Sequence, residues 1–376
     1  MKPVLNRRQF LGMLVSLGLS PGMGWAAPQP ETPSTIGAAW RGPNPGDPYF
    51  AGTLIADWSA ATLRIGYRVR LPTRPHGLVA EADGGLLAVG VRPGAWLLRS
   101  DGGGRIVRQY RVEDEAGACR LNGHAVVARG GEVIYTTETD RRSGAGRIGV
   151  RDGRTLEKID QWDSGGVDPH QAICDRDGTL LVANGGVPRD AADRKFGLDT
   201  MDSSLVRLAA ANGRPLDQWR LGDPRLSMRH LAWSQGGDDR PCLGIALQAE
   251  HDDPARRAAA PVLAVLADDR LIVPAVAGDG SGYAGDVAAA WQGGFVVSSN
   301  QSGTAQFWHP ARAGLLSPVV KLKETAALAT WSAPDGSTGI VVATSLGLVR
   351  WHPVVPPVFL HWPEPMALDN HWVLIA

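Results

Sequence analysis

Four histidines and one aspartate stand at the same place in a pattern that recurs along this chain. Each opens a short apolar run, which is followed by a turn and a second apolar run that ends on another polar residue. Neutral imidazole is a common ligand for zinc, copper, nickel and iron, so such side chains gathered at one place could hold a transition metal. These opening residues are His76, His124, His170, His230 and Asp286.

The residues that end the second apolar runs carry side-chain oxygen atoms. Carboxylate and amide oxygens are the ligands that calcium and magnesium prefer, and Asp286 could join them. The polar positions therefore offer two kinds of site, one built from imidazole nitrogen and one built from oxygen. The oxygen carriers are Glu138, Asn184, Gln248 and Asn300.

The repeats that position these residues have the length of propeller blades. Their first apolar runs begin at His76, His124, His170, His230, Asp286 and Ala327, which lie 48, 46, 60, 56 and 41 residues apart. A third and a fourth β-type run follow, with Asp-Gly or Asn-Gly hairpin signals in several repeats. Four short strands at such a period indicate a β-propeller.

The two ends of the chain supply one more blade. Residues 50–58 and 64–71 look like strands of a blade that lacks its first strand, and residues 366–375 could provide it. Sharing a blade between the ends removes an open sheet edge. We therefore predict an all-β, seven-bladed β-propeller with four-stranded antiparallel blades, in which the first and last segments share one blade.

The predicted blades place the polar residues at one mouth of the central channel. The first strand of a blade lines the channel and the second returns, so opening residues form a ring and second-strand ends lie just outside it. The long connections 139–147, 185–203 and 249–261 emerge on the same face, where binding sites are common. Asp140 and Asp168 flank the ring as possible acceptors for the imidazoles. Arg229 could hold an anionic ligand or form a salt bridge.

Two interpretations of the histidines stay open. In one, a divalent transition metal is held by His124, His170, His230 and Glu138. Three imidazole nitrogens favour such a metal over calcium. In the other, each histidine only hydrogen-bonds the backbone of an adjacent blade and recurs because the repeat was duplicated.

The start of the chain resembles an export signal. Asn6-Arg7-Arg8-Gln9-Phe10-Leu11 is a twin-arginine pattern, and a short apolar stretch with small residues before Ala27 follows it. We expect residues 1–26 to be a twin-arginine signal peptide, cleaved or retained as an anchor, that sends a folded protein to the periplasm. Residues 27–49, rich in Pro and Gly, read as a linker or arm, and residues 50–376 as a single propeller domain.

Composition excludes some functions. The formal net charge is +0, so no basic excess favours nucleic acid. Charges interrupt every later apolar run, so we expect no integral membrane segment. The chain shows no Gly-x-Ser-x-Gly elbow, P-loop, haem-attachment motif or dinucleotide fingerprint. Three cysteines without metal-type spacing predict buried thiols rather than a disulfide.

Several segments together resemble one family of exported bacterial propellers, domain of unknown function family 1513. They are GHAV with YTTETD (123–140), GVDPHQ (166–171), VANGGV (182–187), LDTMDSSL (198–205), SMRHLA (227–232), YAGDVA (283–288) and LDNH (368–371). The resemblance implies a seven-bladed propeller of the WD-repeat and quinoprotein-like type. It also implies a place near periplasmic metal-handling proteins, for iron or copper. Ala327 departs from the pattern, because it leaves the sixth repeat without a polar ring residue.

Two functions follow from these observations. The first, which we favour, is a non-catalytic periplasmic propeller that binds a metal, a partner protein or a small ligand through the His-lined face. The second is a metal-dependent enzyme, such as a lactonase-like hydrolase, that uses the oxygen carriers at the same mouth.

Overall fold

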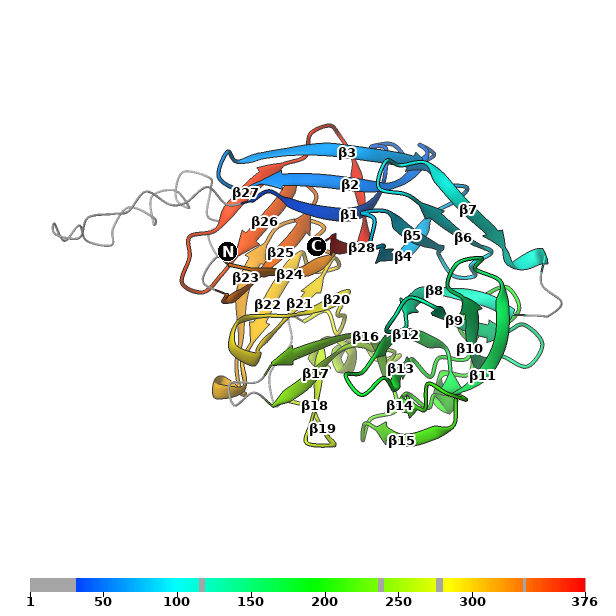
Figure 1. Ribbon diagram of the computed structural model, residues 1–376. Helices are drawn as coiled ribbons and strands as arrows, with labels where there is room; N and C mark the ends of the chain where they lie inside the picture. The colour runs from blue at the N-terminus through cyan, green and yellow to red at the C-terminus, as the bar shows by residue number, and fades with distance from the viewer. Residues whose placement is uncertain (1–31, 115–118, 236–239, 275–279, 334–335, 376) are drawn as a thin grey trace. The chain divides into compact units, whose positions relative to one another are not determined.

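The computed structural model describes residues 32–114, 119–235, 240–274, 280–333 and 336–375. The predicted signal peptide, residues 1–26, lies outside the described residues. Seven four-stranded antiparallel sheets follow one another around a central axis, as predicted (Figure 1).

Six of the seven blades are built from consecutive strands, innermost first. They are β4 (Pro75–Ala80), β5 (Leu86–Gly90), β6 (Trp96–Ser100) and β7 (Ile106–Arg111); β8 (Cys119–Val127), β9 (Val133–Asp140), β10 (Ala145–Asp152) and β11 (Lys158–Val167); β12 (Pro169–Cys174), β13 (Leu180–Asn184), β14 (Ser204–Leu208) and β15 (Pro215–Arg220). They continue with β16 (Leu226–Gln235), β17 (Pro241–Ala249), β18 (Leu263–Ala267) and β19 (Arg270–Ile272); β20 (Asp286–Ala289), β21 (Phe295–Ser299), β22 (Thr304–Trp308) and β23 (Leu316–Lys321); β24 (Leu328–Ser332), β25 (Thr338–Thr344), β26 (Gly347–Trp351) and β27 (Val358–His361).

The remaining blade joins the two ends of the described chain. Its inner strand is the last one, β28 (Ala367–Ile375), and it continues outward through β1 (Ser34–Arg41), β2 (Tyr49–Asp57) and β3 (Thr62–Arg70). Strand β28 pairs with β1 from Thr35–Ile375 to Arg41–Ala367. The predicted closure of the ring by the C-terminal segment is therefore confirmed.

The same blade corrects one prediction. We expected residues 27–49 to be a linker or arm, yet Ser34–Arg41 is a strand with five successive buried residues. Composition misled because Pro and Gly flank this strand on both sides, while its own apolar residues pack inside the blade. Ile36 and Trp40 are 0% and 1% exposed and belong to a core cluster shared with the β24–β27 blade.

The cores lie between adjacent blades rather than at the centre of the molecule. Leu87 and Leu97 of one blade, for example, pack with Leu121 and Ile134 of the next. The second strands β5, β13 and β21 are buried along their whole length, which explains their uninterrupted apolar sequences. Full burial of one such side chain contributes roughly 1.5–3 kcal/mol. Stable inter-blade packing thus fixes where each inner strand begins.

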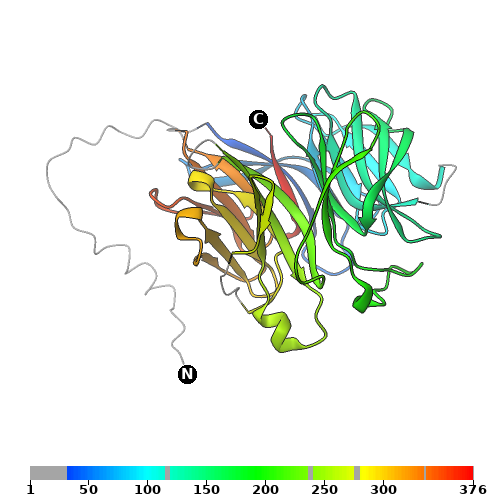
Figure 2. The same cartoon turned by 90° about the horizontal axis from the view of Figure 1, so that it is seen from below.

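The inner strands form a closed ring around the channel. Each contacts the inner strand of the next blade, in the order β28, β4, β8, β12, β16, β20, β24 and back to β28. Figure 2 shows β28 passing near the centre of this ring. Short helices occur only between strands of the described part: α2 (Pro254–Ala259), η1 (Val112–Asp114), η2 (Leu198–Thr200), η3 (Trp291–Gly293) and η4 (Pro310–Arg312).

Among the described residues, no helix has both the length and the apolar character that crossing a membrane requires. The three cysteines are free thiols, as predicted; Cys119 and Cys242 are buried, whereas Cys174 is only partly buried.

Candidate metal centre

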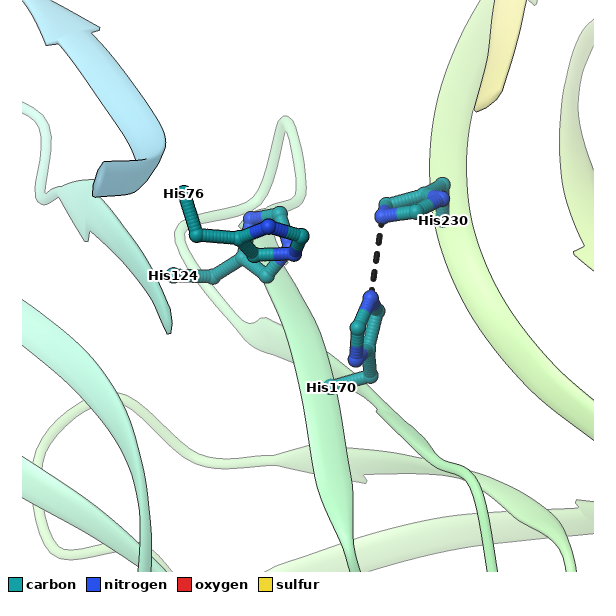
Figure 3. Close-up of side chains that lie close together, drawn as sticks. All are labelled: His76, His124, His170 and His230. Carbon is teal, nitrogen blue, oxygen red and sulfur yellow. Dashed lines mark hydrogen bonds between the residues drawn. The ribbon is translucent and has the colours of Figure 1, made fainter. Parts of the chain in front are cut away.

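Five histidines from five consecutive inner strands converge on the channel axis. Four are the predicted ones, His76 on β4, His124 on β8, His170 on β12 and His230 on β16, and Figure 3 shows their rings facing one another. The fifth is His371 on β28, whose ring centroid lies 4.5 Å from that of His76 and 4.4 Å from that of His230. We call these five residues the histidine cluster.

A local break in strand pairing carries each of these histidines toward the axis. The register of the inner strand against its neighbour shifts between Pro75 and Leu78, and between Leu121 and Ala125. Similar shifts enclose His170, between Pro169 and Ala172, and His230, between Met228 and Leu231. For His371 the shift is seen in the partner strand β1, between Ala38 and Trp40. A β-bulge bends the strand and redirects a side chain out of the pleat, so five bulges aim five imidazoles at one point.

Glycines let two of these strands approach closely. Gly123 has a φ of 103°, and a Cβ atom there would lie 2.7 Å from Cδ2 of His76. A Cβ atom on Gly77 would lie 2.5 Å from the carbonyl oxygen of Gly123. Only glycine therefore lets His76 and His124 come together with ring centroids 4.7 Å apart.

We expect Gly123→Ala to destabilise the protein more than Gly130→Ala. Both glycines have strongly positive φ values, 103° and 98°, but an added Cβ meets no atom within 4 Å at Gly130. Backbone strain costs about 1–2 kcal/mol in both variants, and crowding against His76 adds about 1–3 kcal/mol in Gly123→Ala alone. Urea unfolding of the two variants measures the difference. Equal losses would show that His76 does not depend on this close approach.

The ring nitrogens are close enough to share one ion. One ligand nitrogen from each of His76, His124, His170 and His230 can be chosen so that all lie within 4.8 Å of one another. The Nε2 atoms of His170 and His230 are 3.0 Å apart. Two nitrogens bound to one metal at about 2.0–2.1 Å are separated by roughly 3 Å, so this spacing fits coordination to a common ion.

Each of the five rings also has a buried nitrogen without a hydrogen-bond partner. These atoms are Nδ1 of His76, Nε2 of His124, Nδ1 of His170, Nδ1 of His230 and Nε2 of His371. An unpaired buried polar atom ordinarily costs about 1–3 kcal/mol. Five neighbouring rings that each carry such an atom are the pattern expected where a bound ion completes the site.

Burial favours the neutral form of four of these imidazoles. His124, His170, His230 and His371 are 3–8% exposed, and His76 is partly buried. Desolvation, followed by repulsion from neighbouring imidazoles or arginines, lowers the pKa of His76, His124, His170 and His230 well below the ordinary value. Neutral imidazole is the form that binds a metal.

Two blades, β20–β23 and β24–β27, contribute no histidine to the cluster. Asp286 opens β20, but its Oδ1 accepts from the backbone of Val287 at 2.9 Å and its Oδ2 from that of Leu328 at 2.9 Å. Oδ2 also lies 3.7 Å from Nδ1 of His371, so Asp286 stands beside the fifth histidine without a hydrogen bond to it. Ala327, in the last blade, offers no donor atom.

The predicted flanking residues form a buried ion cluster beside the histidines. Asp168, at 2% exposure, binds Arg229 through Oδ2 at 2.9 Å and Arg92 through Oδ1, and Arg189 lies 3.6 Å away. Burial alone would raise the pKa of Asp168, but the guanidinium groups of Arg92, Arg229 and Arg189 outweigh it and lower that pKa. These contacts tie three blades together. Asp140, by contrast, accepts a hydrogen bond from the backbone N–H of Arg142 within its own turn.

The predicted oxygen carriers have separate partners. The Glu138 carboxylate, 0% exposed, binds Arg151 at 2.7 Å and Lys158 at 2.6 Å inside its blade. The amide of Asn184 exchanges hydrogen bonds with Ser164. Gln248 donates to the carbonyl of Ala284, and Asn300 is exposed. The four side chains thus serve four different places in the fold.

His371 is the member of the cluster that the site prediction missed. We assigned residues 366–375 to the inner strand of the shared blade, and five of the other six inner strands carry a polar residue at the ring position, Ala327 being the exception. The same rule applied to MALDNHWVLI would have pointed to His371 or Asp369. Asp369 instead pairs with Arg74 through two hydrogen bonds of 2.9 Å, which join β28 to the next blade.

Solved structures with this fold come from very different proteins. The chain is similar to hydrazine synthase of Kuenenia stuttgartiensis at 13% identity, covering 90% of this chain and 100% of that one, with a TM-score of 0.58. It is similar to a hypothetical selenium-binding protein of Sulfolobus tokodaii at 14% identity, covering 93% of both chains, with a TM-score of 0.61. A putative 6-phosphogluconolactonase of Bacteroides uniformis matches at 14% identity over 92% and 100%, with a TM-score of 0.57. At such identities the likeness shows the propeller fold alone.

A search of curated proteins found no match. The family comparison is specific: residues 69–375 match the model described as Protein of unknown function (DUF1513). That range contains all five histidines of the cluster. The chain therefore belongs to the DUF1513 family.

Proposed function

We propose that this protein is a metal-binding propeller of the periplasm that holds one divalent transition-metal ion in the histidine cluster. The observation that carries the proposal is the convergence of five imidazoles, each with a buried ring nitrogen that has no hydrogen-bond partner. A purely architectural histidine would use its ring nitrogens on neighbouring backbone. Here Nε2 of His170 and Nε2 of His230 face each other at 3.0 Å, and each of the five rings keeps one buried nitrogen without a hydrogen-bond partner.

The donor set favours iron, copper, zinc or nickel. All five donors are nitrogen, whereas calcium and magnesium take oxygen ligands. The oxygen carriers are engaged elsewhere, in the ion pairs of Glu138 and the hydrogen bonds of Asn184. A calcium-dependent hydrolase built on them has no support from these contacts, so we favour binding over catalysis.

The proposed surroundings of the ion come from this chain's own residues. Asp286 lies 3.7 Å from His371, and the arginine cluster around Asp168 links the blades that carry His170 and His230. Partners that load or receive the metal would be other periplasmic metal-handling proteins. The twin-arginine pattern supports this location, since that route exports folded proteins.

The test is elemental analysis of the full chain, purified from periplasm without chelator. We expect one equivalent of copper, iron, zinc or nickel in the wild-type protein and its loss in His124→Ala/His170→Ala. The matched control, His309→Ala/His361→Ala, removes two imidazoles outside the cluster and should keep the metal. Circular dichroism verifies that each variant is folded.

Three results would overturn the proposal. They are a metal-free wild-type protein that also fails to take up any of these ions after purification, calcium as the bound ion, or a transition metal that persists in the folded His124→Ala/His170→Ala variant.

A further inference from the structure

The ring around the proposed ion has one sector without a nitrogen donor. Five consecutive blades contribute histidine, and the two blades between β16 and β28 contribute Asp286 and Ala327. Both carboxylate oxygens of Asp286 accept backbone hydrogen bonds, and Ala327 is fully buried with only a methyl group. A metal at the histidine cluster would therefore be open on this side.

A cavity of about 270 Å³ lies on the same side of the channel. It is lined by the four inner strands that flank the open sector, β16, β20, β24 and β28. Its lining starts one residue along from the ring positions, at Val287 after Asp286, Leu328 after Ala327 and Trp372 after His371. Along these three strands the cavity therefore begins directly after the ring positions.

The burial of its lining gives the cavity a direction. Val287, Leu328 and Trp372, next to the ring, are 5%, 5% and 7% exposed. Two residues further along the same strands, Ala289, Thr330 and Leu374 are partly exposed. The lining is therefore more exposed at the end of the channel away from the ring, and its buried end lies one residue from three of the ring positions.

The chemistry of the lining selects a small ligand of low charge. The lining residues carry no ionisable group. Two of them, Trp233 and Trp372, have buried indole N–H groups without a hydrogen-bond acceptor. An unpaired buried donor is costly, and an acceptor atom on a bound molecule would satisfy it.

We propose that the metal ion keeps a coordination position facing this cavity for a ligand of two or three heavy atoms that bonds through a terminal nitrogen or oxygen atom. Dioxygen, nitric oxide and azide belong to this class. The ligand reaches the ion along the apolar lining, and the indole of Trp372 donates to it. This inference rests on the proposed metal-binding function, which it extends from storage of an ion to recognition of a second molecule.

The test is a titration of copper-loaded protein with azide, followed by optical and electron paramagnetic resonance spectra. We expect saturable spectral changes with one azide per copper in the wild-type protein. Ala329→Leu, which fills the cavity lining, should weaken azide binding at least tenfold. Its matched control is Ala172→Leu, two residues after the ring histidine of β12 and outside the cavity, which should leave affinity unchanged.

A second pair of variants tests the indole donor. Trp372→Phe should weaken azide binding about fivefold, the value of one hydrogen bond. Trp40→Phe removes another buried indole N–H without a partner, in the same blade but outside the cavity, and should have no effect.

Copper content separates the two proposals. A protein that holds one copper but shows no change with azide would overturn this inference and leave metal binding intact. Unchanged affinity in both Ala329→Leu and Trp372→Phe would overturn the assignment of the cavity. A wild-type protein that binds no copper, iron, zinc or nickel would overturn both proposals together.

Discussion

Replacing Glu138 by alanine lowers the free energy of unfolding by about 3–5 kcal/mol, because it removes a buried carboxylate that is paired with the buried guanidinium of Arg151. Glu138 and Arg151 are both 0% exposed and are joined by a 2.7 Å ion pair. The other carboxylate oxygen binds Lys158 at 2.6 Å, so one side chain connects β9, β10 and β11. Thr136 donates to the same carboxylate at 2.7 Å. Urea unfolding measures the loss.

Asp163→Ala is the matched control for this loss. It breaks the 2.7 Å pair between Arg147 and Asp163 in the same blade, but the Asp163 side chain is 66% exposed. An exposed ion pair contributes about 0–1 kcal/mol, so the control should change stability little. The metal content of folded Glu138→Ala should equal that of the wild type. A variant that keeps its stability but loses the metal would instead make Glu138 a ligand.

Acid should destabilise the metal-free protein steeply below pH 6.5. The pKa values of His76, His124, His170 and His230 are lowered in the folded state, chiefly by burial. In the unfolded chain these imidazoles take up protons near pH 6.5, so the unfolded state binds more protons as the pH falls. The stability is retained above that pH and is lost progressively below it. With four protons taken up on unfolding, the slope approaches about 5 kcal/mol per pH unit.

Urea unfolding in the presence of a chelator, repeated from pH 7.5 to pH 5, measures this slope. The variant His124→Gln/His170→Gln lacks two of the four groups, so its slope should be about 3 kcal/mol per pH unit smaller. Bound metal should shift the loss to lower pH, because protons then compete with the ion for the ring nitrogens. A stability that stays level between pH 7 and pH 5 in the metal-free protein would show that these four imidazoles take up protons as readily in the folded protein as in the unfolded chain.

The positions of the inner strands were predictable because they depend on repetition. A polar residue before an apolar run recurs at blade-length intervals, and four of the five clustered histidines follow from that spacing. The fold supports the prediction because each blade uses the same strand order. His371 follows the same spacing, 44 residues after Ala327, and was missed because the rule was not extended to the strand that closes the ring.

The directions of the side chains were not predictable from the repeats. Successive residues of a strand point to opposite faces, so the end of a second strand can face the channel mouth or a neighbouring blade. Glu138 faces into its blade, and the partners that hold it, Arg151 and Lys158, stand on two other strands. The bulges that turn the histidines inward depend on pairing partners, which no single strand encodes.

The strand that closes the ring also governs the order in which the molecule can assemble. Six blades need only contacts between neighbouring hairpins, whereas β28 meets β1 across the whole described chain, from Thr35 to Ile375. Closing a loop of that length costs only about 3 kcal/mol more than closing a ten-residue hairpin, but the search for it is slow. We therefore expect His76, His124, His170 and His230 to come together before His371 joins them. A metal bound early would have four imidazoles and gain the fifth at closure, so its spectrum would report the moment at which the propeller shuts.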